Sequence, residues 1–166
     1  MKALVFSHLV RTAALGLAFG LGAAGPVAAE TLTLPAGLAC SFALQIDFSG
    51  TRPEVREFRD KDGNLVKTIQ AGKGFQLTFT NLNNGTTLSL KTAGSVTKQT
   101  FNPDGTTTFV TTGHNVLILF PSDVPPGPTT TLTLGRVVFT VDNSTQVFTL
   151  LGTSGRTTDI CAVLLS

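Results

Sequence analysis

The two cysteines are the residues of this sequence with the clearest chemistry. Cys40 and Cys161 are the only cysteines, and each lies in an apolar, strand-like stretch near one end of the chain that follows an expected export signal. In an oxidising compartment two such thiols are expected to form a disulfide. The alternative is a lipid on Cys40, because Leu38-Ala39-Cys40 resembles a lipoprotein cleavage site, but Gly37 stands where a bulky aliphatic residue is wanted. We therefore predict a Cys40–Cys161 disulfide that joins the first and last strands.

A possible calcium loop is the next candidate. Asp60, Asp62 and Asn64 have the spacing that opens such a loop. However, Gly63 lies between them instead of after Asn64, and Ala71 occupies the position of the bidentate glutamate. A tight turn with positive φ at Gly63 accounts for the same residues. The histidine and cysteines that follow the signal are too few for a zinc site, so the sequence predicts neither a metal nor a cofactor.

Groups that could act in hydrolysis are present without a recognisable motif. His114 is the only histidine after the expected signal, and no Gly-x-Ser-x-Gly elbow accompanies it. A triad of His114, Asp123 and Ser154 is an alternative that nothing in the sequence selects. Glu54 and Glu57 could serve a glycosidase, but arginines surround them and the chain has no Trp or Tyr to stack a sugar ring. We therefore predict that the protein is not an enzyme.

The first 29 residues have the features of a secretory signal peptide. Lys2 and Arg11 give a basic start, an Ala-, Leu- and Gly-rich stretch follows, and Val27-Ala28-Ala29 supplies small residues before Glu30. The apolar stretch falls short of the about 20 strongly apolar residues of a membrane span. We expect cleavage after Ala29, secretion, and a single domain of residues 30–166 with no membrane span.

The charge of the mature chain limits its partners. The whole chain carries 12 basic and 10 acidic residues, and loss of Lys2 and Arg11 removes the net charge of +2. A neutral chain lacks the positive footprint of a nucleic-acid binder. Thr, Val, Leu and Phe dominate the chain after Glu30, and β-branched and aromatic residues favour strands. The composition predicts an all-β domain that does not bind nucleic acid.

Alternating apolar residues and turn signals divide the mature chain into strands. Cys40–Phe48 has a clear buried face, Val116–Phe120 is apolar throughout and is expected to be covered on both faces, and Pro121–Pro128 is expected to be a rigid crossover. Further strands are expected at 65–69, 75–80, 86–90, 96–101, 106–111, 132–141, 146–151 and 160–165. Hairpin-like turns between them predict an antiparallel meander of about nine or ten strands, closed as a barrel or folded as a barrel-like sandwich.

Several motifs together resemble a group of secreted bacterial proteins of unknown function that is common in high-GC Gram-positive lineages. The motifs are Ala39-Cys40-Ser41-Phe42, Thr80 to Gly85, Phe101 to Thr106, Phe120 to Pro125, Gly135 to Phe139 and Asp159 to Ala162. The resemblance implies an exported, two-cysteine β-domain and assigns no activity or binding residue.

Taken together, these patterns favour a non-enzymatic secreted β-domain with a surface, structural or binding role. The alternative is a calycin-like β-barrel that holds a small apolar ligand in a Phe-lined interior, since a barrel of eight to ten strands can enclose one small molecule. A cell-surface partner is equally compatible with the sequence.

Overall fold

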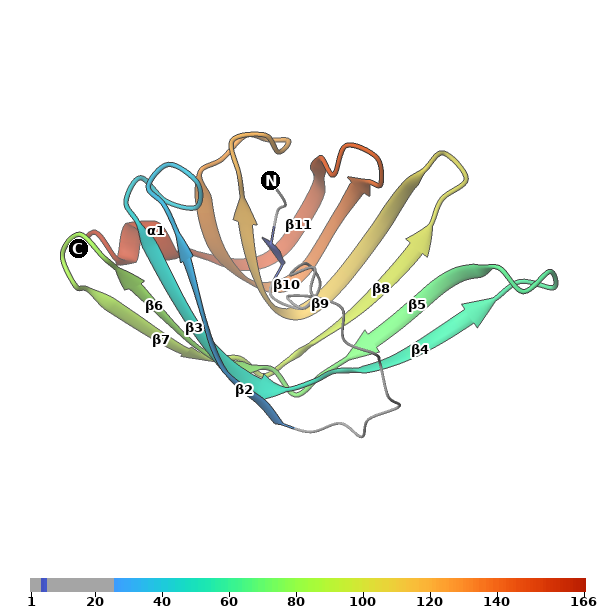
Figure 1. Cartoon of the computed structure of the whole chain (residues 1–166), viewed down its shortest axis with the longest axis horizontal. Coiled ribbons are helices and arrows are strands. Elements are labelled where there is room, and N and C mark those ends of the chain that lie inside the picture. Colours follow the sequence, from blue (N-terminus) through green and yellow to red (C-terminus); the bar gives the residue numbers. More distant parts are fainter. Residues whose placement is uncertain (1–3, 6–25) are drawn as a thin grey trace.

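The computed structural model describes residues 4–5 and 26–166, with side chains from residue 29 onward. The expected signal peptide, residues 1–29, lies outside the described residues except for 4–5 and 26–29. The chain is all-β with one short helix (Figure 1). Its elements are β1 (Leu4–Val5), β2 (Pro26–Leu34), β3 (Leu44–Thr51), β4 (Glu54–Arg59), β5 (Leu65–Ala71), β6 (Phe75–Asn81), β7 (Thr87–Lys91), β8 (Ser95–Phe101), β9 (Thr106–Leu119), β10 (Thr129–Asp142), β11 (Phe148–Asp159) and α1 (Ile160–Val163).

The strands form two antiparallel sheets. A 4-stranded sheet has the order β2-β3-β6-β7, and a 7-stranded sheet has the order β11-β10-β9-β8-β5-β4 with β1 on β9. Short connectors at 52–53, 72–74 and 92–94 carry β3 into β4, β5 into β6 and β7 into β8, so the same ribbons pass from one sheet to the other. The antiparallel all-β fold is therefore confirmed, but a simple meander is not, because β3 pairs with β6 and β5 pairs with β8. The closed barrel is wrong: β4 and β11 are the two ends of the larger sheet and do not pair. The calycin-like alternative loses the closed barrel on which it rested.

Strands β9, β10 and β11 bend into a U, as Figure 1 shows. Gly113, Gly135 and Gly155 lie side by side in the register of these three strands. Gly113 has φ +108°, and a Cβ there would come within 2.5 Å of the Gly94 carbonyl oxygen, so neither the backbone angle nor the space admits a side chain. The sequence pattern predicts a turn at Gly113-His114-Asn115 between two strands, but the structure has one bent strand there.

The main core lies between the smaller sheet and one arm of the U. The predicted face of Cys40, Phe42, Leu44, Ile46 and Phe48 is buried as expected, together with Leu77 and Phe79 of β6. Val116 and Ile118 of β9, Phe120 just after it and Leu132 of β10 cover it from the other side. The intervening Leu117 and Leu119 are buried in a second cluster on the opposite face of β9. The prediction that Val116–Phe120 is covered on both faces is confirmed.

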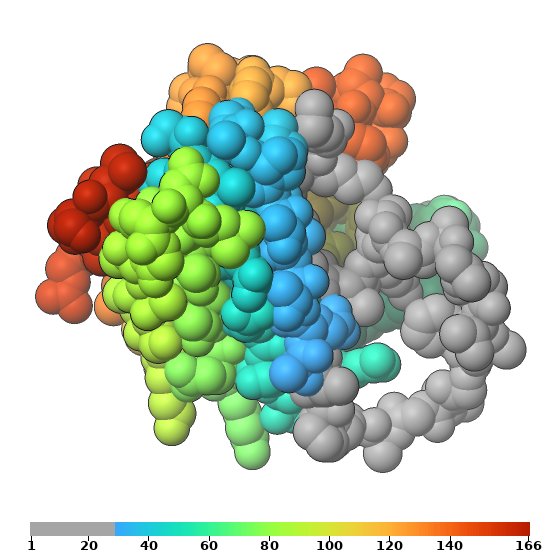
Figure 2. Space-filling model, turned by 60° about the vertical axis from the view of Figure 1, so that its left-hand side comes forward, coloured from blue at the N-terminus to red at the C-terminus, as the bar shows by residue number. Residues whose placement is uncertain are grey.

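The C-terminal segment is helical, so the predicted last strand at 160–165 is wrong. Asp159 caps α1 by accepting a hydrogen bond from the Ala162 amide at 3.0 Å. Ile160 and Leu164 are fully buried, and their spacing of four residues matches one face of a helix. The Leu164 carbonyl accepts hydrogen bonds from the side-chain amides of Asn81 and Asn84, and Figure 2 shows this red end of the chain beside the green strands β6 and β7.

The predicted disulfide is present, but it joins a loop to a helix and not two strands. Cys40 lies in the loop before β3, Cys161 lies in α1, and their Cα atoms are 5.6 Å apart across a sequence separation of 121 residues. The Thr130 hydroxyl of β10 donates to the neighbouring Ala39 carbonyl at 2.9 Å. The disulfide and this hydrogen bond together tie the smaller sheet and the helix to one arm of the U.

Candidate binding surface

The possible catalytic triad is not assembled. His114 lies in β9, where its Nδ1 accepts a hydrogen bond from the Ala93 amide at 2.9 Å. Asp123 follows the end of the strand, and its Oδ2 accepts from the Phe120 amide at 2.7 Å. The residues between 114 and 120 correspond to roughly 20 Å of extended chain. Ser154 is exposed on β11 opposite Arg136. Each candidate group has a structural environment of its own.

The possible calcium loop is a hydrogen-bonded turn. The Asp60 carboxylate accepts from the amides of Asp62 and Asn64 and from the Asn64 side chain. The hydrogen bond from the Asn64 side chain, followed by that from its backbone, lowers the pKa of Asp60. Gly63 has φ +85°, as the turn interpretation requires. In the part of the chain that the structure describes, no three or more His, Cys, Asp or Glu side chains gather to hold a metal ion.

The two glutamates considered for glycoside hydrolysis lie on one exposed strand. Their positions in β4 differ by three residues, so Glu54 and Glu57 point to opposite faces of the sheet. Glu57 instead pairs with Arg59, which shares its face, at 2.8 Å. Glu54 and Glu57 therefore cannot approach one sugar from two sides.

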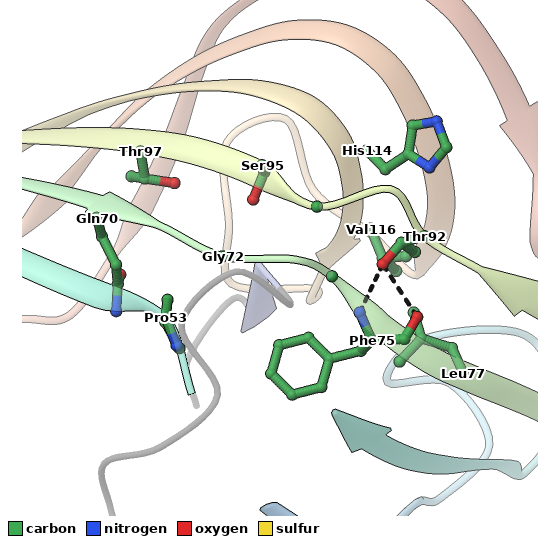
Figure 3. Close-up of a pocket in the computed structure, with 12 residues that line it drawn as sticks. Pro53, Gln70, Gly72, Phe75, Leu77, Thr92, Ser95, Thr97, His114 and Val116 are labelled. Carbon is green, nitrogen blue, oxygen red and sulfur yellow. Dashed lines mark hydrogen bonds between the residues drawn. The ribbon is translucent and has the colours of Figure 1, made fainter. Parts of the chain in front are cut away.

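A small cavity lies where the two sheets diverge (Figure 3). It has a volume of about 30 Å³, which holds one or two water molecules. Phe75, Leu77 and Val116 line one part of it, and Gln70 lies on the other side. The Gln70 Oε1 is buried with no hydrogen-bond partner in the described structure. This cavity can hold ordered water between the two sheets but has no room for an organic ligand.

An aromatic row lies on the inner face of the U. The rings of Phe109 and Phe139 stack with centroids 4.6 Å apart, and those of Phe139 and Phe148 with centroids 4.5 Å apart. Phe109 and Phe139 are directly opposite in β9 and β10. Leu117, Leu119 and Val137 complete the cluster, so the row continues from one arm of the U to the other. Leu117, Leu119, Val137, Phe139 and Phe148 are all buried, so the row forms a second apolar core inside the U.

The edge of β9 next to this row pairs with two different strands. Strand β8 begins at Ser95, opposite Gly113, and the preceding strand β7 belongs to the smaller sheet. The pairing of β8 with β9 therefore stops at Gly113. Beyond that point the strand that pairs with this edge is β1, with Leu4 opposite Ile118 and Val5 opposite Leu117. Residues 115–119 of β9 therefore form an acceptor edge that binds an extended backbone.

The proline-rich connection 121–128 was expected to be a rigid crossover, but it is the loop between the adjacent antiparallel strands β9 and β10, and it packs against the start of β11. Val124 donates its amide to the Phe148 carbonyl at 2.9 Å and accepts from the Leu150 amide at 2.6 Å. Asp123 is 3 % exposed, and its Oδ1 has no hydrogen-bond partner in the described residues. Burial raises the pKa of this carboxyl group, against the opposing effect of the Phe120 amide. Through Val124, the connection is therefore held against β11 next to Phe148.

Comparison with known proteins gave no match: no family model, curated protein or solved structure corresponds to this chain. Helices in the described ranges are all too short or too polar to cross a membrane. The evidence for function therefore comes from the geometry of the chain itself.

The sequence did not single out the aromatic row. Phe109 lies between Thr107 and Thr111, and Phe139 follows Val137 by two residues, so each strand alternates in the way that marks a face. The register that places Phe109 against Phe139 depends on the bend at Gly113 and Gly135, and the sequence pattern at Gly113 predicts a turn. Alternation could have identified the face, but not the alignment of its rings.

Proposed function

We propose that this protein is a non-enzymatic extracellular binding domain that takes up an extended segment of a partner along the β9 edge. The observation that carries the proposal is the pairing of β1 with β9 at Leu117 and Ile118. An edge that binds one extended backbone offers the same amide and carbonyl groups to another. The main-chain hydrogen bonds would supply affinity and fix the direction of the bound segment.

Removal of the expected export signal would make this edge available to a partner. If cleavage follows Ala29, the secreted protein no longer carries residues 4–5 in covalent linkage, and residues 115–119 are open to a partner strand. Both faces of this part of β9 are buried, since Val116 and Ile118 belong to one core and Leu117 to the other. The acceptor would therefore be held rigidly in place before binding, which reduces the entropy cost of association.

The test uses protein secreted after expression of the full chain, with its N-terminus established by intact mass. The probe is a synthetic peptide of residues 1–10, whose backbone contains the β1 pair. We expect the peptide to slow hydrogen exchange at residues 115–119 by at least about tenfold. The matched control is the same peptide with N-methyl groups on the amides of Leu4 and Val5, which retains the side chains and removes two donors.

Loss of binding by the N-methylated peptide would support strand addition. Equal binding of the two peptides, or exchange at residues 115–119 that the peptide leaves unchanged, would rule out this edge as the binding site.

A further inference from the structure

The outer edge of β11 is long and unprotected. In the described structure β11 pairs with β10 alone among the strands, and Leu151–Asp159 is almost entirely exposed. This stretch carries one cation, Arg156, and one anion, Asp159. The opposite end of the same sheet is different, because Glu or Arg occupies four of the six positions of β4. Charged residues discourage pairing at a sheet edge, so β4 is protected and β11 is not.

The open stretch of β11 has fixed limits. At its start Val124 covers the edge through hydrogen bonds with Phe148 and Leu150, and at its end the chain enters α1 at Ile160. The free edge is therefore Leu151–Asp159, and Gly155 is its midpoint. Two copies of this stretch overlap completely in an antiparallel arrangement only when Gly155 lies opposite Gly155.

The bend of the sheet selects the same arrangement. Gly113 pairs with Gly135, and Gly135 pairs with Gly155, so each bend glycine has a glycine beside it. Gly155 has φ +103°, and a Cβ on it would collide with the Leu134 carbonyl oxygen of the neighbouring strand. A strand added to β11 must bend at the same level, which again requires a glycine opposite Gly155. A second copy supplies it.

We propose that two copies of this protein associate through antiparallel pairing of their β11 strands, with Gly155 of one opposite Gly155 of the other. In this register Thr153 faces Thr157 of the second copy, and Ser154 faces Arg156. No like charges are directly opposite, and Thr–Thr pairs are favourable across strands. A shift that centres the pair on Arg156 would instead bring two arginines together.

The dimer forms one continuous sheet from the two larger sheets. A two-fold axis perpendicular to the sheet at Gly155 keeps both aromatic rows on the same side. The free β9 edges are unaffected, because they lie two strands inside each copy. The interface is therefore independent of the binding function proposed above.

The test changes only exposed threonines. T153K/T157K places Lys opposite Lys twice, whereas T153K/T157E places Lys opposite Glu twice in the same register. By sedimentation equilibrium we expect the dimer dissociation constant to rise at least about tenfold in T153K/T157K and to return to the wild-type range in T153K/T157E. A mixture of T153K/T157K with T153E/T157E should form a heterodimer, and thermal unfolding of each variant checks that the monomer fold is intact.

Two results would overturn the proposal. A wild-type protein that stays monomeric at about 100 µM would remove the dimer itself. A T153K/T157K variant that dimerises as well as wild type, or a T153K/T157E variant no better than it, would exclude this register.

Discussion

Two halves of this molecule use the same kinds of strand and differ in what covers them. In the packed half, β2, β3, β6 and β7 face the 114–120 arm of β9, β10 and α1, and their inward side chains are buried. In the open half, β4, β5 and β8 extend as a single layer from the other arm (Figure 1). All six residues of β4 are exposed, whereas β3 alternates buried and half-buried residues along its first part.

The difference follows from the inward side chains. In the packed half they are Leu, Ile and Phe, which contribute stability only when a second layer excludes water. The corresponding face of the open half includes Thr68, Gln70 and Thr97 beside the phenylalanines of the aromatic row. Thr68 and Thr97 are buried although they are polar, and the Thr97 hydroxyl donates to the Thr111 hydroxyl at 2.9 Å. The packed half is therefore held together by apolar contacts, whereas buried polar groups have a larger share in the open half.

Loss of the disulfide should have the largest effect, and it should act on the packed half. Replacement of Cys40 and Cys161 by Ala frees a loop whose ends are separated by 121 residues. The loss of this constraint on the unfolded chain should cost about 4–5 kcal/mol of unfolding free energy. Urea unfolding of the oxidised wild type and the double variant measures the loss. A difference below about 1 kcal/mol would mean that the bond contributes little to the junction of sheet, helix and U.

One aromatic residue in each half gives a direct comparison. Phe79 of β6 is 0 % exposed, whereas Phe58 of β4 is 38 % exposed and lies under the Lys67 ammonium at 4.1 Å. Phe79→Ala should cost about 3–5 kcal/mol because it leaves a cavity, and Phe58→Ala should cost less than about 1 kcal/mol. Chemical denaturation measures both. Similar losses would contradict the division into a packed and an open half.

The bend that separates the two arms should respond to a single methyl group. Gly113→Ala requires positive φ of alanine and drives its Cβ against the Gly94 carbonyl, so it should cost at least about 3 kcal/mol. The control is Gly63→Ala, which has the same backbone constraint but nothing within 4 Å of the added Cβ; it should cost about 1 kcal/mol. Thermal unfolding compares the two. If both variants lose equal stability, close packing of the strands does not fix the bend.

The limits of the sequence can be seen in particular residues. Alternation along Phe42, Leu44 and Ile46 predicted the buried face correctly, because a period of two is a local property. The conformation at Gly113 could not be predicted in the same way, since a positive φ suits both a turn and a bend within a strand, and the register with Gly135 decides between them. Ile160 and Leu164 match helical spacing, but the apolar run around them favours a strand unless the Asp159 cap is known.

The candidate surface was harder to predict than the fold. His114, Asp123 and Ser154 were considered for their chemistry, and each proved to have a separate environment. The aromatic row and the β9 edge depend on contacts between strands distant in sequence, and nothing about Phe109 alone identifies its partner Phe139. The cysteines were an exception because a chain with only two thiols leaves one intramolecular pairing.

The smallest expected effect concerns the turn between β10 and β11, where a carboxylate organises the backbone. The Asp142 carboxylate accepts hydrogen bonds from the Ser144 hydroxyl at 2.6 Å and from the amides of Ser144 and Thr145 at 2.8 Å. These bonds, the Ser144 hydroxyl first, lower the pKa of Asp142 from 3.8 to about 2.

Because the folded-state pKa of Asp142 is depressed, its contribution to stability is present above the unfolded value of 3.8 and is lost as the pH falls through about 2. Asp142→Asn should therefore be less stable than wild type at about pH 6, and the gap should close as the pH approaches 2. Ser144→Ala removes one of the donors, so its loss of stability at about pH 6 should be only part of the loss in Asp142→Asn. Urea unfolding across this range measures the three slopes, and parallel slopes for wild type and Asp142→Asn would show that this turn does not depend on its carboxylate. The opposite shift at the buried Asp123, whose pKa is raised, predicts an opposing slope in the wild type, so the comparison must be made between variants at each pH.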